Sequence, residues 1–141
     1  MNTKFLILLA TLMTFAGSLW AGFVQPQPVD IDMVNHFAHG DMLSARNSAN
    51  DSEFIGCGMR AFDDGLGGAF YTGFCQAQVL DGESVTCFTE NKALLDGIQM
   101  IADNSYVTFS WVEDPVSGAR TCTRIGSSTQ SFYLPKGKPN F

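Results

Sequence analysis

Hydrophobic and polar positions follow two different periods along the chain, and the change between them predicts its secondary structure. Beyond residue 53, apolar and polar residues alternate over short runs separated by glycine, proline and aspartate, which is typical of β-strands. Residues 91–102 instead place Leu95, Ile98 and Ile101 on one face of a helix, and Asn91 is expected to cap its start. The expected strands span residues 54–62, 69–79, 84–89, 106–112 and 119–125, and residues 130–134 could add one more short strand. The sequence therefore predicts a mainly β chain with one central helix.

The order of these elements is three strands, one helix and two strands. A five-stranded Greek-key barrel of the OB-fold type has this β-β-β-α-β-β order, with the helix closing one end of the barrel. Phe109 and Trp111 alternate with polar neighbours, so we expect both to face the core. An open sheet with one helix packed across it has the same order. We expect an OB-fold-like β-barrel over residues 53–141, with the open sheet as the alternative.

The first residues of the chain have the composition of a secretory signal peptide. Lys4 precedes an apolar run over residues 5–15, and small residues follow it. The apolar run is shorter than the roughly 20 residues that span a bilayer. We predict that residues 1–21 direct export and that the remaining protein is secreted or periplasmic, with no membrane span.

Residues 22–52 are predicted to form an N-terminal arm and a short helix. The sequence Gln-Pro-Gln-Pro at residues 25–28 favours extended backbone, and residues 32–46 are expected to be helical. The alternating sequence VDIDMV at residues 29–34 could add a strand to the open sheet edge of a neighbouring copy. This arm provides an alternative function, that of a structural subunit that self-assembles through its N-terminal region.

Four cysteines in an exported chain of this size favour two disulfides. Gly82 suits a three-residue hairpin loop, and counting outward from it places Cys75 opposite Cys87. Directly opposed residues bring their Cβ atoms near disulfide reach. We therefore predict Cys75–Cys87, which leaves Cys57–Cys122. A zinc site is disfavoured because no C-x-x-C pair is present.

The charge of the chain excludes one class of partner. Fourteen acidic residues against eight basic ones give a net charge of −6, which disfavours binding to the phosphates of nucleic acid. Bases gather toward the end of the chain, at Arg120, Arg124, Lys136 and Lys138. This basic end is either a solvated tail or a surface that docks on an acidic face of a neighbouring copy.

The residues that could take part in catalysis form no recognisable catalytic combination along the chain. His36 and His39 are the only histidines, and a helix would place both on one face, which makes them candidate metal ligands. The sequence contains no G-x-S-x-G elbow and no twelve-residue calcium loop. We therefore expect no enzyme activity, no cofactor and no resident metal.

Aromatic residues suggest binding instead. On the predicted strands and near their end, Tyr71, Tyr106 and Tyr133 are candidates for exposed positions that stack on a sugar or line a protein interface. The leading hypothesis is an exported, non-catalytic binding module that recognises a glycan or protein partner through the barrel surface. We expect this module to work as a homo-oligomer. A periplasmic or extracellular inhibitor is a further alternative.

The chain resembles two known groups of proteins. The block CFTENKALLDGIQMIADNSYVTFSW, together with the leader and the size of the chain, resembles the OB-fold B subunits of AB5 toxins at the level of topology. That resemblance implies a pentameric, glycan-binding protein. The segments ARNSANDSEFIGCGMRAFDD, SYVTFSW and CTRIGSSTQSFYLP resemble small exported bacterial proteins of uncharacterised function, which implies export but no activity.

Overall fold

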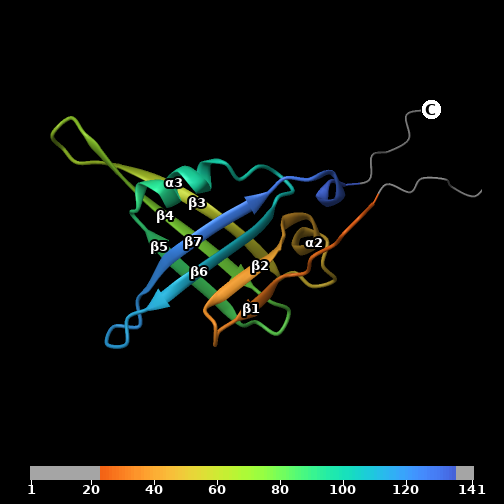
Figure 1. The fold of residues 1–141 in the computed structure, drawn as a ribbon. Helices are drawn as coiled ribbons and strands as arrows, with labels where there is room; N and C mark the ends of the chain where they lie inside the picture. The colour runs from red at the N-terminus through yellow and green to blue at the C-terminus, as the bar shows by residue number, and fades with distance from the viewer. Residues whose placement is uncertain (1–22, 136–141) are drawn as a thin grey trace, which may run out of the picture.

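In a computed structural model that describes residues 23–135, seven strands form one sheet (Figure 1). The strands are β1 (Asp30–Asp32), β2 (Phe37–Asp41), β3 (Phe54–Asp63), β4 (Ala69–Gln78), β5 (Ser84–Thr89), β6 (Tyr106–Glu113) and β7 (Arg120–Ser128). The helical elements are α2 (Met42–Arg46), α3 (Lys92–Gln99) and the 3₁₀ turn η1 (Ser131–Tyr133). The strand order is β1-β2-β6-β7-β5-β4-β3, with β5 and β7 parallel and all other neighbours antiparallel.

The prediction of a mainly β chain is confirmed, and the strands between residues 54 and 125 lie close to their expected bounds. Asn91 caps α3 as expected, because its side-chain oxygen accepts a hydrogen bond from the Ala93 N–H at 2.9 Å. Gly82 has the positive φ of 91° that the β4–β5 loop requires. The exception is residues 130–134, where η1 replaces the expected last strand.

The prediction of a closed five-stranded barrel is not confirmed, because the sheet is open and ends at β1 and β3. A barrel built from the five strands β3, β4, β5, β6 and β7 would close only if β3 paired with β6. In the structure β2 occupies that edge of β6, with Ala38 opposite Phe109 and Gly40 opposite Val107. The N-terminal region therefore extends the sheet where the barrel would have closed.

The predicted helix over residues 32–46 is wrong for most of its length. Asp32 Oδ1 accepts hydrogen bonds from the N–H groups of Val34 and Asn35, which makes a tight turn after β1. His36 then adopts a positive φ of 53°, and β2 returns antiparallel to β1. Only the last five residues form a helix, α2. The local turn chemistry of Asp32 outweighs the helical spacing of the apolar residues.

The N-terminal arm packs on its own chain. β1 pairs with β2, the Asp41 N–H donates to the Gln27 carbonyl at 2.8 Å, and the Gln25 N–H donates to the Phe132 carbonyl at 3.3 Å. The strand expected to reach a neighbouring copy is thus part of the sheet of the same protein.

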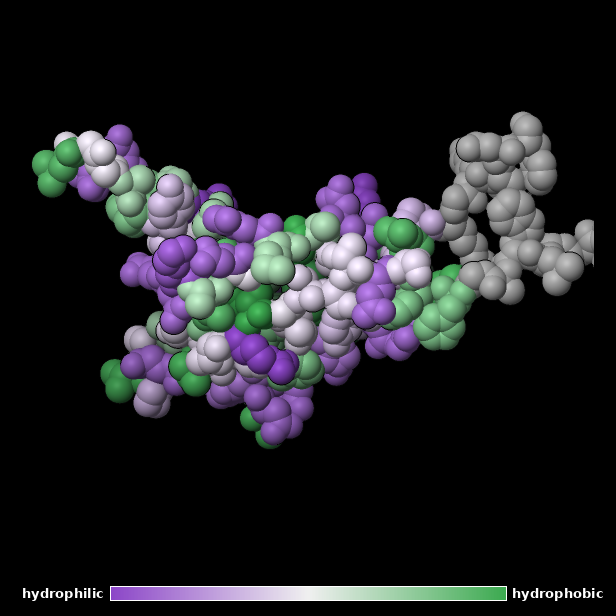
Figure 2. All heavy atoms as spheres, turned by 45° about the horizontal axis from the view of Figure 1, so that its top comes forward, coloured by the Kyte–Doolittle hydropathy of each residue, from purple (hydrophilic) through white to green (hydrophobic). Residues whose placement is uncertain are grey.

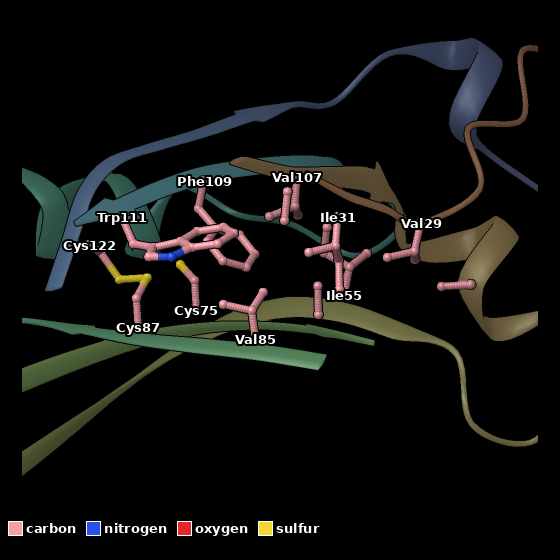
Figure 3. Packing of buried hydrophobic residues seen from close by; sticks show 13 residues of the cluster. Val29, Ile31, Ile55, Cys75, Val85, Cys87, Val107, Phe109, Trp111 and Cys122 are labelled. Carbon is pink, nitrogen blue, oxygen red and sulfur yellow. A yellow bond between two sulfur atoms is a disulfide. The ribbon is translucent and has the colours of Figure 1, made fainter. Parts of the chain in front are cut away.

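The core lies between two halves of this curled sheet (Figure 3). Val107, Phe109 and Trp111 project from β6 toward Cys75 of β4 and the residues of β5. Phe109 is fully buried and Trp111 is 2% exposed, which confirms that both face the core. Burial between the two halves, rather than closure of a barrel, supplies the apolar interior.

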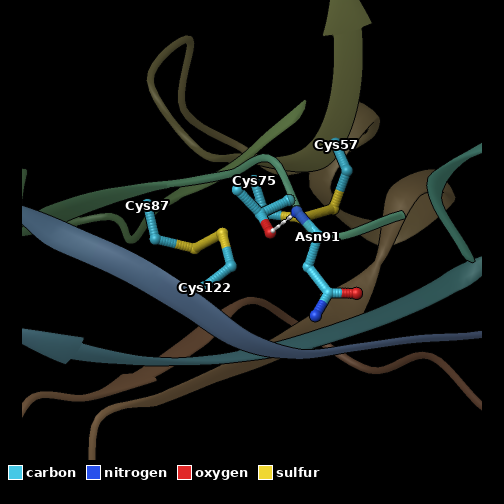
Figure 4. The surroundings of a disulfide bond; sticks show 6 residues. Cys57, Cys75, Cys87, Asn91 and Cys122 are labelled. Carbon is cyan, nitrogen blue, oxygen red and sulfur yellow. Dashed lines mark hydrogen bonds between the residues drawn. A yellow bond between two sulfur atoms is a disulfide. The ribbon is translucent and has the colours of Figure 1, made fainter. Parts of the chain in front are cut away.

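The predicted disulfide pairing is wrong, although the strand register behind it is correct. Cys75 lies opposite Cys87 on β5 and also opposite Cys57 on β3. The bonds are Cys57–Cys75 and Cys87–Cys122 (Figure 4). Cys57 and Cys75 have Cα atoms only 4.0 Å apart, which is typical of a non-hydrogen-bonded pair.

The hydrogen-bond alternation of the strands explains this choice. The Val79 N–H donates to the Glu83 carbonyl, so every second pair counted back from there, including Cys75–Cys87, is hydrogen-bonded. Hydrogen-bonded pairs hold their Cα atoms about 5.5 Å apart, whereas the alternate pairs come closer. Cys75 therefore meets Cys57 more closely than Cys87, and Cys87 bonds to Cys122 on β7 instead.

The predicted signal peptide, residues 1–21, and the lysines at positions 136 and 138 lie outside the described residues. Among the helices of residues 23–135, none has the length and apolar character needed to cross a membrane.

Candidate functional site

The end of the β3–β4 hairpin projects from the body of the protein (Figure 1). Every residue from position 60 to position 71 is exposed. Apolar side chains gather at the tip of this projection beside hydrophilic ones (Figure 2), and Leu66 in the loop is 92% exposed. The hairpin therefore offers two uncovered faces.

A groove separates the inner face of this hairpin from α3. It encloses about 460 Å³. Its lining residues are Met59, Phe70, Tyr71, Glu90, Lys92, Leu95, Asp96 and Gln99. We call this cavity the α3 groove.

Glycine at position 73 determines where the α3 groove begins. A Cβ atom there would lie 2.6 Å from Ile98 Cδ1 and 2.8 Å from Leu95 Cδ2, so α3 packs directly on the backbone of β4 at this point. Nearer the hairpin tip, Tyr71 has a large side chain in place of the glycine. The helix no longer contacts the strand closely there, and the groove lies between them.

The rim of the α3 groove is polar. Lys92 Nζ lies 3.1 Å from both carboxylate oxygens of Asp96, one helical turn later. Gln99 Nε2 contacts Met59 Sδ across the groove at 3.9 Å. Glu90 is exposed and makes no hydrogen bond or ion pair with the other described side chains. Carboxylate, ammonium and amide groups thus surround an apolar and aromatic floor.

The start of α3 holds these rim residues in place. The Asn91 N–H donates to Thr89 Oγ1 at 3.1 Å (Figure 4), and the Asn91 side chain caps the helix. Thr89 is buried at the end of β5, two residues after Cys87, which is bonded to Cys122. Glu90 and Lys92 therefore flank a residue that is tied to the disulfide-bonded core.

The opposite, outer face of β3–β5 is rich in phenylalanine. Phe62 and Phe70 stack with ring centroids 5.2 Å apart, and the Arg60 guanidinium lies 5.2 Å from the centre of the Phe74 ring. Phe74 lies opposite Phe88, which is 58% exposed. These residues, Arg60, Phe62, Phe70, Phe74 and Phe88, define the phenylalanine face, and Phe70 near the hairpin tip also borders the α3 groove.

The three predicted binding tyrosines lie in different places. Tyr71 is 48% exposed and lines the α3 groove. The expectation that Tyr133 is exposed is wrong, because it is 7% exposed. Tyr106 is half-buried and stacks on Tyr133 with ring centroids 5.6 Å apart. These two tyrosines attach η1 to β6, far along the chain from Tyr71.

Burial changes the acidity of the stacked tyrosines. Desolvation raises the pKa of Tyr106, while the Arg124 charge acts in the opposite direction. Desolvation also raises the pKa of Tyr133, and the neighbouring Tyr106 and Asp41 add to this effect. Both phenols are therefore neutral over the physiological pH range, as a packing role requires.

The two histidines do not share a site. His36 lies in the turn before β2 and stacks on Trp111 with ring centroids 5.5 Å apart. His39 lies within β2, with Nε2 3.5 Å from Asp30 Oδ2. Placing both on one helix face was wrong because residues 37–41 form a strand. Within residues 23–135, no group of three metal-ligating side chains comes together.

Sequence reasoning missed most of the α3 groove and of the phenylalanine face. Glu90, Lys92, Asp96 and Gln99 belong to the polar side of the predicted helix, which the apolar periodicity alone treats as solvated surface. Phe62 and Phe88 lay within predicted strands, but which strand face was covered was not evident. The polar helix face beside an exposed tyrosine was the available signal.

Comparison with known family models, curated proteins and solved structures finds no match to this chain. The resemblances to AB5 toxin B subunits and to small exported bacterial proteins therefore remain predictions.

Proposed function

We propose that this protein is a non-catalytic binding module that takes a carbohydrate ligand in the α3 groove. The observation that carries this proposal is the combination of the exposed Tyr71 ring with the polar rim along α3. Sugar rings present apolar C–H faces that pack on aromatic rings, and hydroxyl groups that bond to carboxylates and amides. The floor and the rim of the groove supply these two kinds of contact side by side.

The size of the α3 groove suits a short ligand. Its volume of about 460 Å³ lies toward the lower end of the range for small-molecule sites, which is roughly 300–1,000 Å³. One side of the groove is formed by the exposed hairpin, so a longer glycan could continue beyond it. A terminal sugar unit held at Tyr71 is the expected mode of binding.

A protein partner is the second candidate, and the phenylalanine face favours it. Phe62, Phe70 and Phe88 are 43%, 52% and 58% exposed on one sheet face. Exposed apolar patches of this kind are typical of protein interaction sites, where phenylalanine and arginine are enriched. This protein partner would contact the sheet face opposite to the one that carries the buried cysteines. Tyr71 would then stay available for a ligand in the α3 groove.

The other functions expected from the sequence have less support. Self-assembly through the N-terminal arm would require an arm that is free to leave its own sheet, and β1 is paired within the chain. An inhibitory role has no residue that carries it. The two disulfides are consistent with an oxidising compartment, so a secreted or periplasmic location is part of the proposal.

A glycan array followed by calorimetric titration tests the carbohydrate proposal. Tyr71→Ala should weaken binding of an array-identified glycan at least about tenfold, because loss of a stacking contact worth about 1.4 kcal/mol changes affinity by that factor. Tyr71→Phe keeps the ring and should bind nearly as well as the wild type. Phe88→Ala serves as the matched control on the opposite face.

The outcomes separate the two candidates. A glycan that binds wild type and Tyr71→Ala equally would contradict the α3 groove as its site. Loss of a protein partner in Phe88→Ala, with Tyr71→Ala unaffected and no glycan bound, would favour the phenylalanine face instead.

A further inference from the structure

The two edges of the sheet differ in length and in chemistry. β1 has three residues with aspartate at both ends, whereas β3 has ten residues. β3 pairs with β4 in an unbroken register, and no backbone hydrogen bond joins it to another described element. The side of β3 that faces away from β4 therefore has no backbone partner among the described elements, and from Arg60 onward the strand is exposed.

The alternation of hydrogen bonds identifies these groups. The Asp64 N–H donates to the Gly68 carbonyl just beyond β3, so the even-numbered positions of β3 form the hydrogen-bonded pairs with β4. The short Cα distance of 4.0 Å between Cys57 and Cys75 agrees with this assignment. The positions whose N–H and C=O groups point to the open edge are Ile55, Cys57, Met59, Ala61 and Asp63.

The β3 edge lacks most of the features by which proteins prevent strands from associating. It contains no proline, no lysine and no bulge, and its charged residues are Arg60 and the terminal Asp63. The part of it that projects is a two-stranded ribbon with both faces exposed. Such a ribbon is only marginally stable in water, and further strands stabilise it.

We propose that a second copy of this chain pairs with the β3 edge, so that two β3 strands run antiparallel about a two-fold axis at Ala61. An antiparallel strand edge is complementary to itself under this symmetry, because each copy offers the same donors and acceptors in reverse order. The two projecting hairpins become one four-stranded ribbon, and the two sheets become continuous.

The side chains favour this register over the one with its axis at Arg60. With the axis at Ala61, Arg60 of one copy lies opposite Phe62 of the other, where a guanidinium can pack on an aromatic ring as Arg60 already does on Phe74. A shift of the axis to Arg60 would place two guanidinium groups opposite each other, which is destabilising. The small side chain of Ala61 allows close approach at the centre.

This inference goes beyond the proposed function, because it uses the backbone edge of β3 and not the side chains of the α3 groove. Glycan binding at Tyr71 and pairing at Ala61 can therefore succeed or fail separately.

The test compares Ala61→Pro with Ala61→Thr, using native mass spectrometry and light scattering without reductant. Proline removes the N–H of position 61. Because this N–H points away from β4, no hydrogen bond to β4 is lost, and proline is tolerated at strand edges of this kind. Threonine keeps the N–H and favours strands. We expect dimers for the wild type and Ala61→Thr, and folded monomers for Ala61→Pro.

A third variant covers the case in which Ala61→Pro does not fold. Directly opposed, hydrogen-bonded residues have Cα atoms about 5.5 Å apart, which is within disulfide range, and no other free cysteine competes for position 61 as Cys57 does for Cys75. Ala61→Cys should therefore form a covalent dimer on oxidation, whereas Thr72→Cys, on β4 of the same hairpin, should not. A monomeric wild type, a dimer that persists in folded Ala61→Pro, or equal cross-linking of the two cysteine variants would overturn the proposal.

Discussion

The two ends of the β3–β4 pair have the same backbone pairing and very different surroundings. At one end Ile55, Cys75 and Ala77 are buried beneath β6 and the N-terminal strands. At the other end every residue from 60 to 71 is exposed. The register continues unbroken between them. Burial in this protein thus depends on which elements lie across the strands, and the uncovered end is where partners can bind.

The covered end should account for most of the stability. Phe109→Ala removes a fully buried ring and should lower the free energy of unfolding by about 3–5 kcal/mol. Phe70→Ala, at the exposed end, removes one member of an exposed stacked pair and should cost less than about 1 kcal/mol. Chemical denaturation of both variants, followed by Trp fluorescence, measures the difference. Equal losses would show that the projecting hairpin is as firmly packed as the core.

The boundary between the two ends lies at Gly73, where α3 contacts β4. Gly73→Ala should destabilise the protein by about 1 kcal/mol, because the new methyl group must displace the terminal methyl groups of Ile98 and Leu95. Gly56→Ala is the matched control on β3, since a Cβ there meets nothing within 4 Å. Thermal unfolding should show a lower midpoint for Gly73→Ala only. A similar shift in both variants would mean that strand conformation, not the packing of α3, is responsible.

The smallest expected effect concerns two aromatic stacks on the outer side of the sheet. In the Tyr106–Tyr133 stack Tyr133 of η1 is buried, whereas both rings of the Phe62–Phe70 stack are exposed. The pKa values of both tyrosines are raised in the folded protein, so folding favours their neutral form. Stability should therefore be fully present below the ordinary phenol pKa of about 10 and decrease as the pH rises through the higher folded values.

Urea denaturation at pH 8 and pH 10.5 measures this effect. The double variant Tyr106→Phe and Tyr133→Phe should lose less stability between the two pH values than the wild type, because its rings cannot ionise. Every other side chain is common to both proteins, so its contribution cancels in the comparison. An identical pH dependence would show that the stacked tyrosines ionise as freely in the folded state as in the unfolded state.

Local pattern predicted those parts of the fold that depend on near neighbours. The β4–β5 hairpin and its register follow from Gly82, the start of α3 follows from Asn91, and the inward positions of β6 follow from alternation at Phe109 and Trp111. The exposure of Tyr71 was predicted in the same way. In each case a turn, a cap or a two-residue period acts within a few residues, so the sequence alone contains the relevant physics.

Tertiary structure decided what depends on contacts between distant segments. Cys75 lies between Cys57 and Cys87, and only the hydrogen-bond alternation of three assembled strands selects its partner. The barrel stays open because β2, which precedes β3 in the chain, takes the edge of β6. The α3 groove and the free β3 edge likewise depend on where distant elements pack. A strand's own sequence specifies its two faces, but only the elements placed against it determine which face and which edge remain open.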